Sequence, residues 1–308
     1  MRASTSRPEP ELEAAPSCLG ETSRAVSPSP VDATARRRNL GTLAIAGVAL
    51  FYGLIVLYYI GPFGDTRSFW LPWSRPIYDP ATPLWDAHFV YSPVAALVLR
   101  PFGILPFPIF AAMWTVLGIA TYAWLLWPLP AVPRVVALAA GCTFALNGNV
   151  EWALAFMVVL GMSRPSAWLF AAFTKVSPFM GFGWFVWTRD WHAVATTAAV
   201  GALLIIVTAI AVPDLWATWL PMLLTFRDQT AHAGPLMPAV PLLPRIPIAA
   251  AVLLWGAATR RSVVLPVVVL LTQPDLQPWI FGYLAALPRL WLMLPRGQQP
   301  EASGAVAP

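Results

Sequence analysis

Apolar residues occur in long runs along most of the chain, and polar residues collect between these runs. The run at residues 39–64, NLGTLAIAGVALFYGLIVLYYIGPFG, contains no charged residue. An α-helix needs about 20 such residues to cross the ~30 Å hydrocarbon core of a bilayer, so this run predicts a membrane-spanning helix. Runs of this kind recur, and together they predict an all-α, polytopic transmembrane bundle.

Nine further runs predict further spans, and their charged flanks predict the orientation. The run at 133–162 fits either one long helix or two helices that turn at Asn147-Gly148-Asn149. Basic residues favour the cytoplasmic side, so Arg36–Arg38 place the N-terminus there. Two helices put Arg189 and Arg260-Arg261 on that side as well, which gives about ten spans with both termini inside. The candidate runs are 90–105, 107–128, 133–147, 150–162, 165–187, 191–212, 245–259, 262–273 and 277–294.

The two ends of the chain differ from this apolar centre. Residues 1–38 are rich in Pro, Ser, Ala and Glu and hold few large apolar residues. Such a composition cannot offset the entropy of ordering, so it predicts a disordered cytoplasmic tail. Residues 39–295 form the predicted transmembrane domain, and 296–308 form a second disordered tail. We therefore expect a multi-pass protein of the plasma membrane with a cytoplasmic N-terminus.

Composition supports a membrane protein and excludes several other classes. The 308 residues are 58% hydrophobic and 11% charged, far from the balance of a soluble domain. The formal net charge of +5 comes from Arg residues in the tail and short loops, so it reflects topology and predicts no nucleic-acid partner. The His and Cys residues lack zinc-ligand spacing, and no phosphate-binding glycine loop is present, so no cofactor or metal is predicted.

One loop after the first span concentrates polar and aromatic residues. It reads GPFGDTRSFWLPWSRPIYDPATPLWDAHFVYSP, residues 61–93, and it lies on the extracytoplasmic side of the predicted topology. An aspartate such as Asp65 can act as a general base for a hydroxyl within hydrogen-bond reach. The alternative is a solvated loop with Asx turns at Asp79 and Asp86.

Lys175 is the most informative charge within an apolar run. It lies midway through SAWLFAAFTKVSPFMGFGWFVW, residues 166–187, too far from either end to reach the interface easily. Charges inside spans are costly and usually face a bundle interior or a wet cavity. Two interpretations follow: a structural ion pair, for which Glu151 is the candidate partner, or a cation that receives an anionic group such as a phosphate.

Several short motifs resemble glycosyltransferase family 87, integral-membrane enzymes of the GT-C type. These motifs are GDTRSFW at 64–70, IYDP at 77–80, FVYSPVAALVLRPFGILPFPIFAAMW at 89–114, NGNVEWALAFMVV at 147–159 and FAAFTKVSPFMGFGWFVWTRDW at 170–191. The resemblance covers roughly residues 40–294. The chain departs from the family pattern at Thr66 and Ser92, and before its final helix it offers Gln273, Asp275 and Gln277 where relatives often carry a His.

The resemblance implies a hexosyltransferase that works at the extracytoplasmic face. Its donor would be a polyprenyl-phosphate sugar, mannose being the usual case, and its acceptor a glycolipid or a growing glycan. Asp65 is the predicted catalytic base. The predicted substrate-binding residues are Lys175, Arg67, Arg75, Tyr91, Asn149 and Glu151. Two alternatives stay open, a transporter or flippase for a lipid-linked sugar and a non-catalytic membrane scaffold.

Overall fold

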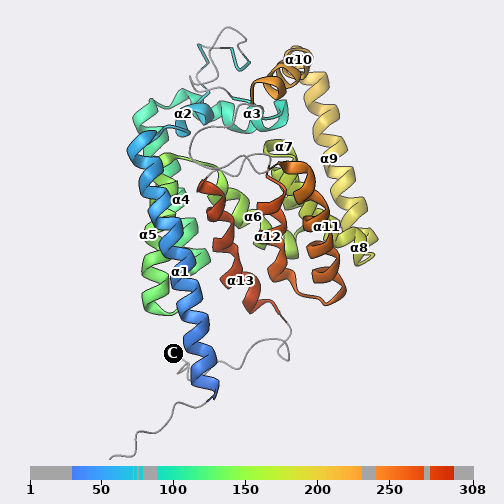
Figure 1. The fold of residues 1–308 in the computed structure, drawn as a ribbon. Coiled ribbons are helices and arrows are strands. Elements are labelled where there is room, and N and C mark those ends of the chain that lie inside the picture. Colours follow the sequence, from blue (N-terminus) through green and yellow to red (C-terminus); the bar gives the residue numbers. More distant parts are fainter. Residues whose placement is uncertain are drawn as a thin grey trace, which may run out of the picture.

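All regular secondary structure is helical in the part of the chain that the computed structural model describes (Figure 1). That part covers residues 30–71, 73–74, 76–78, 89–230, 241–273 and 278–294, with the side chains of 30–35 and 224–230 left out. The prediction of an all-α protein is confirmed for these residues. Arg75, Asp79, Asp86, Asp275 and Gln277 lie outside them.

The described part of the chain consists of α-helices that are linked by loops and short 3₁₀ helices. The α-helices are α1 (Pro30–Tyr59), α2 (Thr66–Phe69), α3 (Pro93–Leu99), α4 (Phe107–Leu126), α5 (Ala131–Asn147), α6 (Glu151–Ser163), α7 (Trp168–Thr174), α8 (Gly183–Trp187), α9 (Trp191–Ala211), α10 (Pro213–Thr230), α11 (Leu242–Ala258), α12 (Leu265–Leu271) and α13 (Leu287–Leu292). Short 3₁₀ helices join them: η1 (Arg100–Ile104), η2 (Pro165–Ala167), η3 (Ser177–Phe182), η4 (Ser262–Val264) and η5 (Pro278–Ala286).

Three of the described helices are long and apolar enough to cross a membrane, namely α1 from Arg36 onward, α4 and α9. The pair α5 and α6 qualifies together as a fourth candidate, although its two helices are bent by 119° at the break. Large apolar side chains cover the outer surface of the candidate spans, among them Phe51 on α1, Val116 on α4 and Ile210 on α9. Apolar surface on this scale is expected where lipid, rather than water, is the solvent.

Helix α1 begins earlier than the sequence predicted. Residues 30–38 were assigned to the disordered tail, but they form the first turns of α1. Residues 1–29 and 295–308 lie outside the described part of the chain, so the rest of the two predicted tails is not tested. The helix therefore carries Arg36, Arg37 and Arg38 on its first turns, all three exposed.

The segment predicted to span at 90–105 does not cross the bundle. It forms the short helices α3 and η1, which lie across the same end as α2 (Figure 1). As a result α4 runs antiparallel to α1, and Arg38 lines the same cavity as Pro128–Pro130 at the far end of α4. The ten-span topology placed Arg134 on the side opposite Arg38, and the structure corrects this.

The segment predicted to span at 165–187 is a helical hairpin. Helix α7 ends at Thr174, Lys175 is extended, and η3 then folds back along α7. Gly181 on η3 lies directly against the indole of Trp168 at the start of α7, where an added Cβ would overlap the ring. Lys175 therefore lies at the tip of the hairpin and not in the middle of a straight span.

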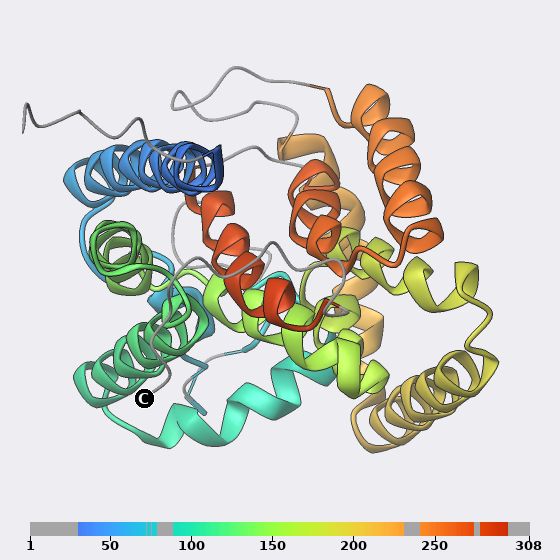
Figure 2. The same ribbon diagram turned by 90° about the horizontal axis from the view of Figure 1, so that it is seen from below.

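The core is built around α6, which lies at the centre of the bundle (Figures 1 and 2). Its buried side chains include Leu154 and Val159, and they pack with Tyr122 from α4 and Tyr283 from η5. Because α6 is surrounded on all sides, its first residue, Glu151, is fully buried as well. The charge of Glu151 therefore requires partners within the protein.

Candidate functional site

Asp65 is held in place by the backbone of the loop that follows α1. The chain turns at Gly61 and Phe63, both with positive φ. The Phe63 N–H then donates to the Leu146 carbonyl at 2.7 Å, and the Asp65 N–H donates to the Asn147 carbonyl at 3.0 Å. These bonds satisfy carbonyls at the C-terminus of α5 that have no partner within the helix. Asp65 is thus fixed beside the end of α5.

Aromatic packing anchors the short helix α2 that Asp65 begins. Phe69 stacks between Trp114 of α4 and Tyr91, with ring centroids 4.9 and 5.5 Å away. The Trp70 indole N–H donates to the Leu105 carbonyl at 2.9 Å. A four-residue helix has little stability of its own, so these contacts determine where α2 and Asp65 lie.

Gly148 allows α2 to approach the turn between α5 and α6. Its φ of +91° is left-handed, the usual conformation of a residue that ends a helix. A Cβ at this position would overlap the Thr66 side chain. The Trp114 indole N–H also donates to the Gly148 carbonyl at 2.8 Å. Glycine is therefore required here both for its backbone conformation and for the space it leaves.

The turn at Gly148 brings Asn149 against Asp65. Asn149 Nδ2 donates to Asp65 Oδ2 at 2.8 Å, and Asn149 Oδ1 accepts from the Val150 N–H at 2.7 Å. The backbone bond fixes the orientation of the amide, so its NH₂ group faces the carboxylate. Asn149 therefore orients one oxygen of Asp65.

Lys175 and Glu151 form an ion pair next to this contact. Lys175 Nζ lies 2.5 Å from Glu151 Oε1, and the Tyr283 hydroxyl donates to the same oxygen at 3.3 Å. The Lys175 side chain is 22% exposed, whereas that of Glu151 is fully buried. Two bonds from Ser92, at the start of α3, to the Phe173 carbonyl at the end of α7 hold the tip of the hairpin in place.

The electrostatic environment favours the neutral form of Asp65. Burial raises the pKa of Asp65 from 3.8 to about 6, and the Glu151 carboxylate adds to this rise. Lys175 and the hydrogen bond from Asn149 partly offset it. A carboxyl group with a pKa near 6 can accept a proton at neutral pH more readily than an ordinary aspartate can.

Several buried polar atoms around the cluster have no hydrogen-bond partner within the described protein. They are Thr66 Oγ1, Tyr122 Oη, both amide atoms of Asn147 and Glu151 Oε2. Buried polar atoms are usually paired, and their concentration beside Asp65 marks this part of the bundle as unusual. These atoms include both hydrogen-bond donors and acceptors.

The structure brings together five of the predicted site residues, Asp65, Tyr91, Asn149, Glu151 and Lys175. Tyr91 lies near enough that Lys175, Glu151 and Asp65 all affect its pKa, which burial raises. Arg67 is not in this cluster. It is exposed, and its guanidinium lies over the Phe107 ring of α4, 5.5 Å from the centroid. Arg75 lies outside the described residues.

Sequence reasoning missed three members of the cluster. Asn147 carried a signal, because it is part of the Asn-Gly-Asn turn. Tyr122 and Tyr283 carried none, since each lies in an apolar helix where a tyrosine is ordinary. Tyr283 meets Glu151 across 132 residues of sequence, so only the tertiary packing reveals the contact.

The two carboxylates of the cluster are not grouped with further potential metal ligands among the described residues. Each of its two carboxylates already has a partner, Asn149 for Asp65 and Lys175 for Glu151. Within the described ranges, no group of three or more His, Cys, Asp or Glu side chains could hold a metal ion.

Comparison of the chain with protein-family models, with curated proteins and with solved structures finds no match. The resemblance to glycosyltransferase family 87 therefore depends on the short motifs alone, and four of these motifs supply residues to the cluster.

Proposed function

We propose that the protein is an integral-membrane hexosyltransferase of the GT-C type, with Asp65 as its general base. The donor is a polyprenyl-phosphate sugar, mannose by resemblance, and the acceptor is a glycolipid or glycan. The observation that supports this most is the convergence of Asp65, Asn149 and Lys175. These residues come from three motifs of the resemblance, and the Asp65–Asn149 bond joins positions 84 residues apart.

Each member of the cluster has a distinct part in the proposed reaction. Asp65 accepts the proton of the acceptor hydroxyl, and Asn149 keeps its carboxylate oriented. An ammonium group has three N–H donors, and among the described residues Lys175 donates to Glu151 alone. Since Lys175 is also part-exposed, its other donors remain for the departing phosphate. Glu151 positions Lys175 from the buried side.

The site faces the extracytoplasmic side in this proposal, because α1 carries Arg36–Arg38 in its first turns and ends shortly before Asp65. A polyprenyl-linked donor reaches such a site from within the bilayer, and no nucleotide sugar is needed there. An all-helical bundle with several candidate spans supports this proposal. The count of ten spans is not part of the proposal, because it requires residues 90–105 to cross.

The ion pair between Lys175 and Glu151 supports a second candidate, a scaffold or carrier without catalysis. In that case the pair is structural, as buried pairs often are, and Asp65 needs no proton-accepting role. A transporter or flippase would likewise tolerate the loss of a base.

Asp65→Asn separates these possibilities. The change preserves shape and hydrogen bonding but removes the proton acceptor. Membranes containing the variant are incubated with labelled polyprenyl-phosphate mannose, and label in lipid-extractable glycan is measured. We expect transfer to fall about 10²–10⁴-fold, the usual contribution of a positioned base, with donor binding retained.

Asp214→Asn is the matched control, because Asp214 is an exposed carboxylate in the first turn of α10. We expect it to transfer at the wild-type rate. Transfer by Asp65→Asn at a rate close to that of Asp214→Asn would remove the catalytic assignment and favour the carrier or scaffold.

A further inference from the structure

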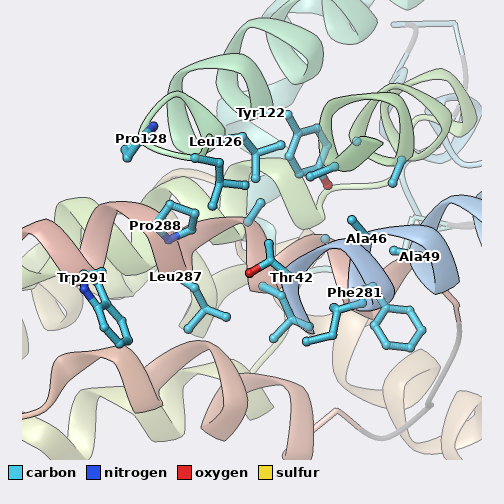
Figure 3. Close-up of a pocket in the computed structure, with 18 of the residues that line it drawn as sticks. Thr42, Ala46, Ala49, Tyr122, Leu126, Pro128, Phe281, Leu287, Pro288 and Trp291 are labelled. Atoms are coloured by element: carbon cyan, nitrogen blue, oxygen red, sulfur yellow. The ribbon is translucent and has the colours of Figure 1, made fainter. Parts of the chain in front are cut away.

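A cavity of about 410 Å³ lies at the end of the bundle away from Asp65. It is bordered by α1, the end of α4, α5, η5 and α13, and it is partly open to the surface (Figure 3). In the view from below, α1 lies next to α5 and to the C-terminal segment of η5 and α13 (Figure 2). The cavity is within the size range of small-molecule sites, about 300–1,000 Å³. Neither Asp65 nor Lys175 lines it.

The cavity is polar at one end and apolar along its length. Arg38, Asn39 and Thr42 line the end at the start of α1. Beyond them the walls are almost entirely apolar, and the hydroxyl-bearing Tyr122 is reached near the inner end. The apolar walls include Ala46, Ala49, Leu126, Ala140, Phe144, Phe281, Leu287 and Trp291 (Figure 3). None of the described residues that line the cavity is acidic.

Basic residues gather at the polar end. Arg36 and Arg37 are exposed next to Arg38 on α1. Arg134 and Arg289 lie on the flanking helices α5 and α13, where they donate to the carbonyls of Trp127 and Trp124. Within the described side chains, the Arg38 guanidinium makes no hydrogen bond or ion pair. Arg38 is therefore available to an anion at the mouth of the cavity.

The length of the cavity matches one leaflet of a bilayer. It follows α1 from Arg38 to Ala49, and at a rise of about 1.5 Å per residue this stretch is roughly 16 Å long. The hydrocarbon core of a bilayer is ~30 Å thick, so a single leaflet is about 15 Å deep. An acyl chain that extends inward from the interface fits this length.

We propose that this cavity binds one anionic phospholipid, with an acyl chain in the apolar groove and its phosphate at Arg38. Basic pockets between transmembrane helices bind anionic lipid head groups in this way. The bound head group lies at the end of α1 opposite Asp65, so the lipid is not the sugar donor. Tyr122 and Gly282 close the inner end, and Gly282 packs against Glu151 and Tyr122. The lipid therefore supports the wall behind the Asp65 cluster.

The test is native mass spectrometry of the full chain in detergent with added phosphatidylglycerol or, separately, phosphatidylcholine. We expect one retained phosphatidylglycerol per protein and much weaker retention of phosphatidylcholine. Arg38→Gln should reduce the affinity for phosphatidylglycerol about fivefold, the usual contribution of one arginine at an anionic surface. Arg36→Gln is the matched control, because Arg36 is exposed and does not line the cavity, and it should change little.

A second pair of variants tests the groove itself. Ala46→Phe fills the apolar part, because Ala46 is buried and faces the cavity (Figure 3), and it should abolish retention. Val48→Phe, at an exposed position on the same helix, should not. Equal retention of the two lipids, or equal effects of Arg38→Gln and Arg36→Gln, would overturn the proposal even if Ala46→Phe fails to fold. Retention of neither lipid would also overturn the proposal, because the cavity would then hold no phospholipid.

Discussion

Lys175 at the tip of the α7–η3 hairpin pairs with Glu151 at the first turn of α6, and this places a part-exposed positive charge and a buried negative charge beside Asp65. The pair links the tip of the hairpin to the start of α6, in addition to the packing of α7 against α6. Removal of one partner from a buried pair leaves an uncompensated charge, which costs roughly 3–5 kcal/mol.

Lys175→Met should therefore destabilise the protein, because Glu151 remains fully buried without its counter-charge. We expect a clearly lower unfolding temperature in detergent, measured by tryptophan fluorescence. The double variant Lys175→Met/Glu151→Gln should recover much of the loss, because buried pairs are often replaced by uncharged groups at little cost. Arg67→Met, which removes an exposed cation near the same end, should have no effect. Equal stability of Lys175→Met and wild type would show that the pair contributes nothing to the fold.

The sequence identified several residues of the cluster, but it did not determine which of their side chains contact each other. Asp65, Asn149, Glu151 and Lys175 were identified from local motifs, and the Lys175–Glu151 pair was one of the two interpretations considered. Whether Lys175 is free or paired depends on where α6 places Glu151, which local pattern does not specify. A turn at Asn147-Gly148-Asn149 was one of two interpretations and was preferred because of where it placed the basic residues; the structure shows a bend of 119° there, with Gly148 left-handed.

The course of the chain through the bundle was less predictable. Residues 165–187 satisfy the length rule for a span, yet they fold back at Lys175 and Pro178. The lysine and the proline were a usable signal, because a charge and a missing N–H donor both disfavour a continuous helix in lipid. Residues 90–105 gave no such warning, since an apolar run broken by proline fits a crossing helix and a helix lying across the end equally well.

The pH dependence of transfer should report the raised pKa of Asp65. In the proposed reaction the carboxylate must be ionised, so the rate should rise with pH through about 6 and level off above it. Glu151 raises this pKa and Asn149 lowers it. Glu151→Gln should therefore move the midpoint to lower pH, and Asn149→Ala should move it to higher pH.

The raised pKa of Asp65 also affects the stability of the fold. Whereas the transfer rate should rise with pH, the contribution of Asp65 to stability should fall as pH rises. Asp65 has a higher pKa when folded than the ordinary 3.8, so the folded state binds a proton more tightly than the unfolded state. Its contribution to stability is therefore greatest below pH 4 and is lost as pH rises through about 6. Asp65→Asn should reduce this pH dependence of unfolding.

For the pH dependence of transfer, a rate midpoint that is the same in Glu151→Gln and Asn149→Ala would show that Asp65 is not the titrating group.

Gly148→Ala should disrupt the site more than an ordinary helix-end substitution. The left-handed conformation costs an alanine about 1–2 kcal/mol, and the alanine Cβ would also overlap Thr66. We expect both lower stability and a loss of transfer activity, because α2 and Asp65 are displaced. Gly47→Ala is the control, since a Cβ at Gly47 meets nothing within 4 Å and alanine is favoured in a helix interior. Wild-type transfer by Gly148→Ala would show that the α2–turn contact does not position Asp65.

The position of Arg134 leads to a test of topology that distinguishes the structure from the ten-span prediction. Val132 is exposed at the start of α5, near Pro128–Pro130, which line the same cavity as Arg38. Arg260 follows α11, whose end lies toward the same side as the start of α1 (Figure 1). Ser74 is exposed beyond α2, at the Asp65 end.

In a chain whose two native cysteines are replaced, we expect Ser74→Cys to react with an impermeant thiol reagent applied to intact cells. Val132→Cys and Arg260→Cys should react only after the membrane is opened. Reaction of Val132→Cys in intact cells would restore the crossing at residues 90–105 and reverse the orientation of α4 relative to α1, because Val132 and Arg38 would then lie on opposite sides of the bilayer.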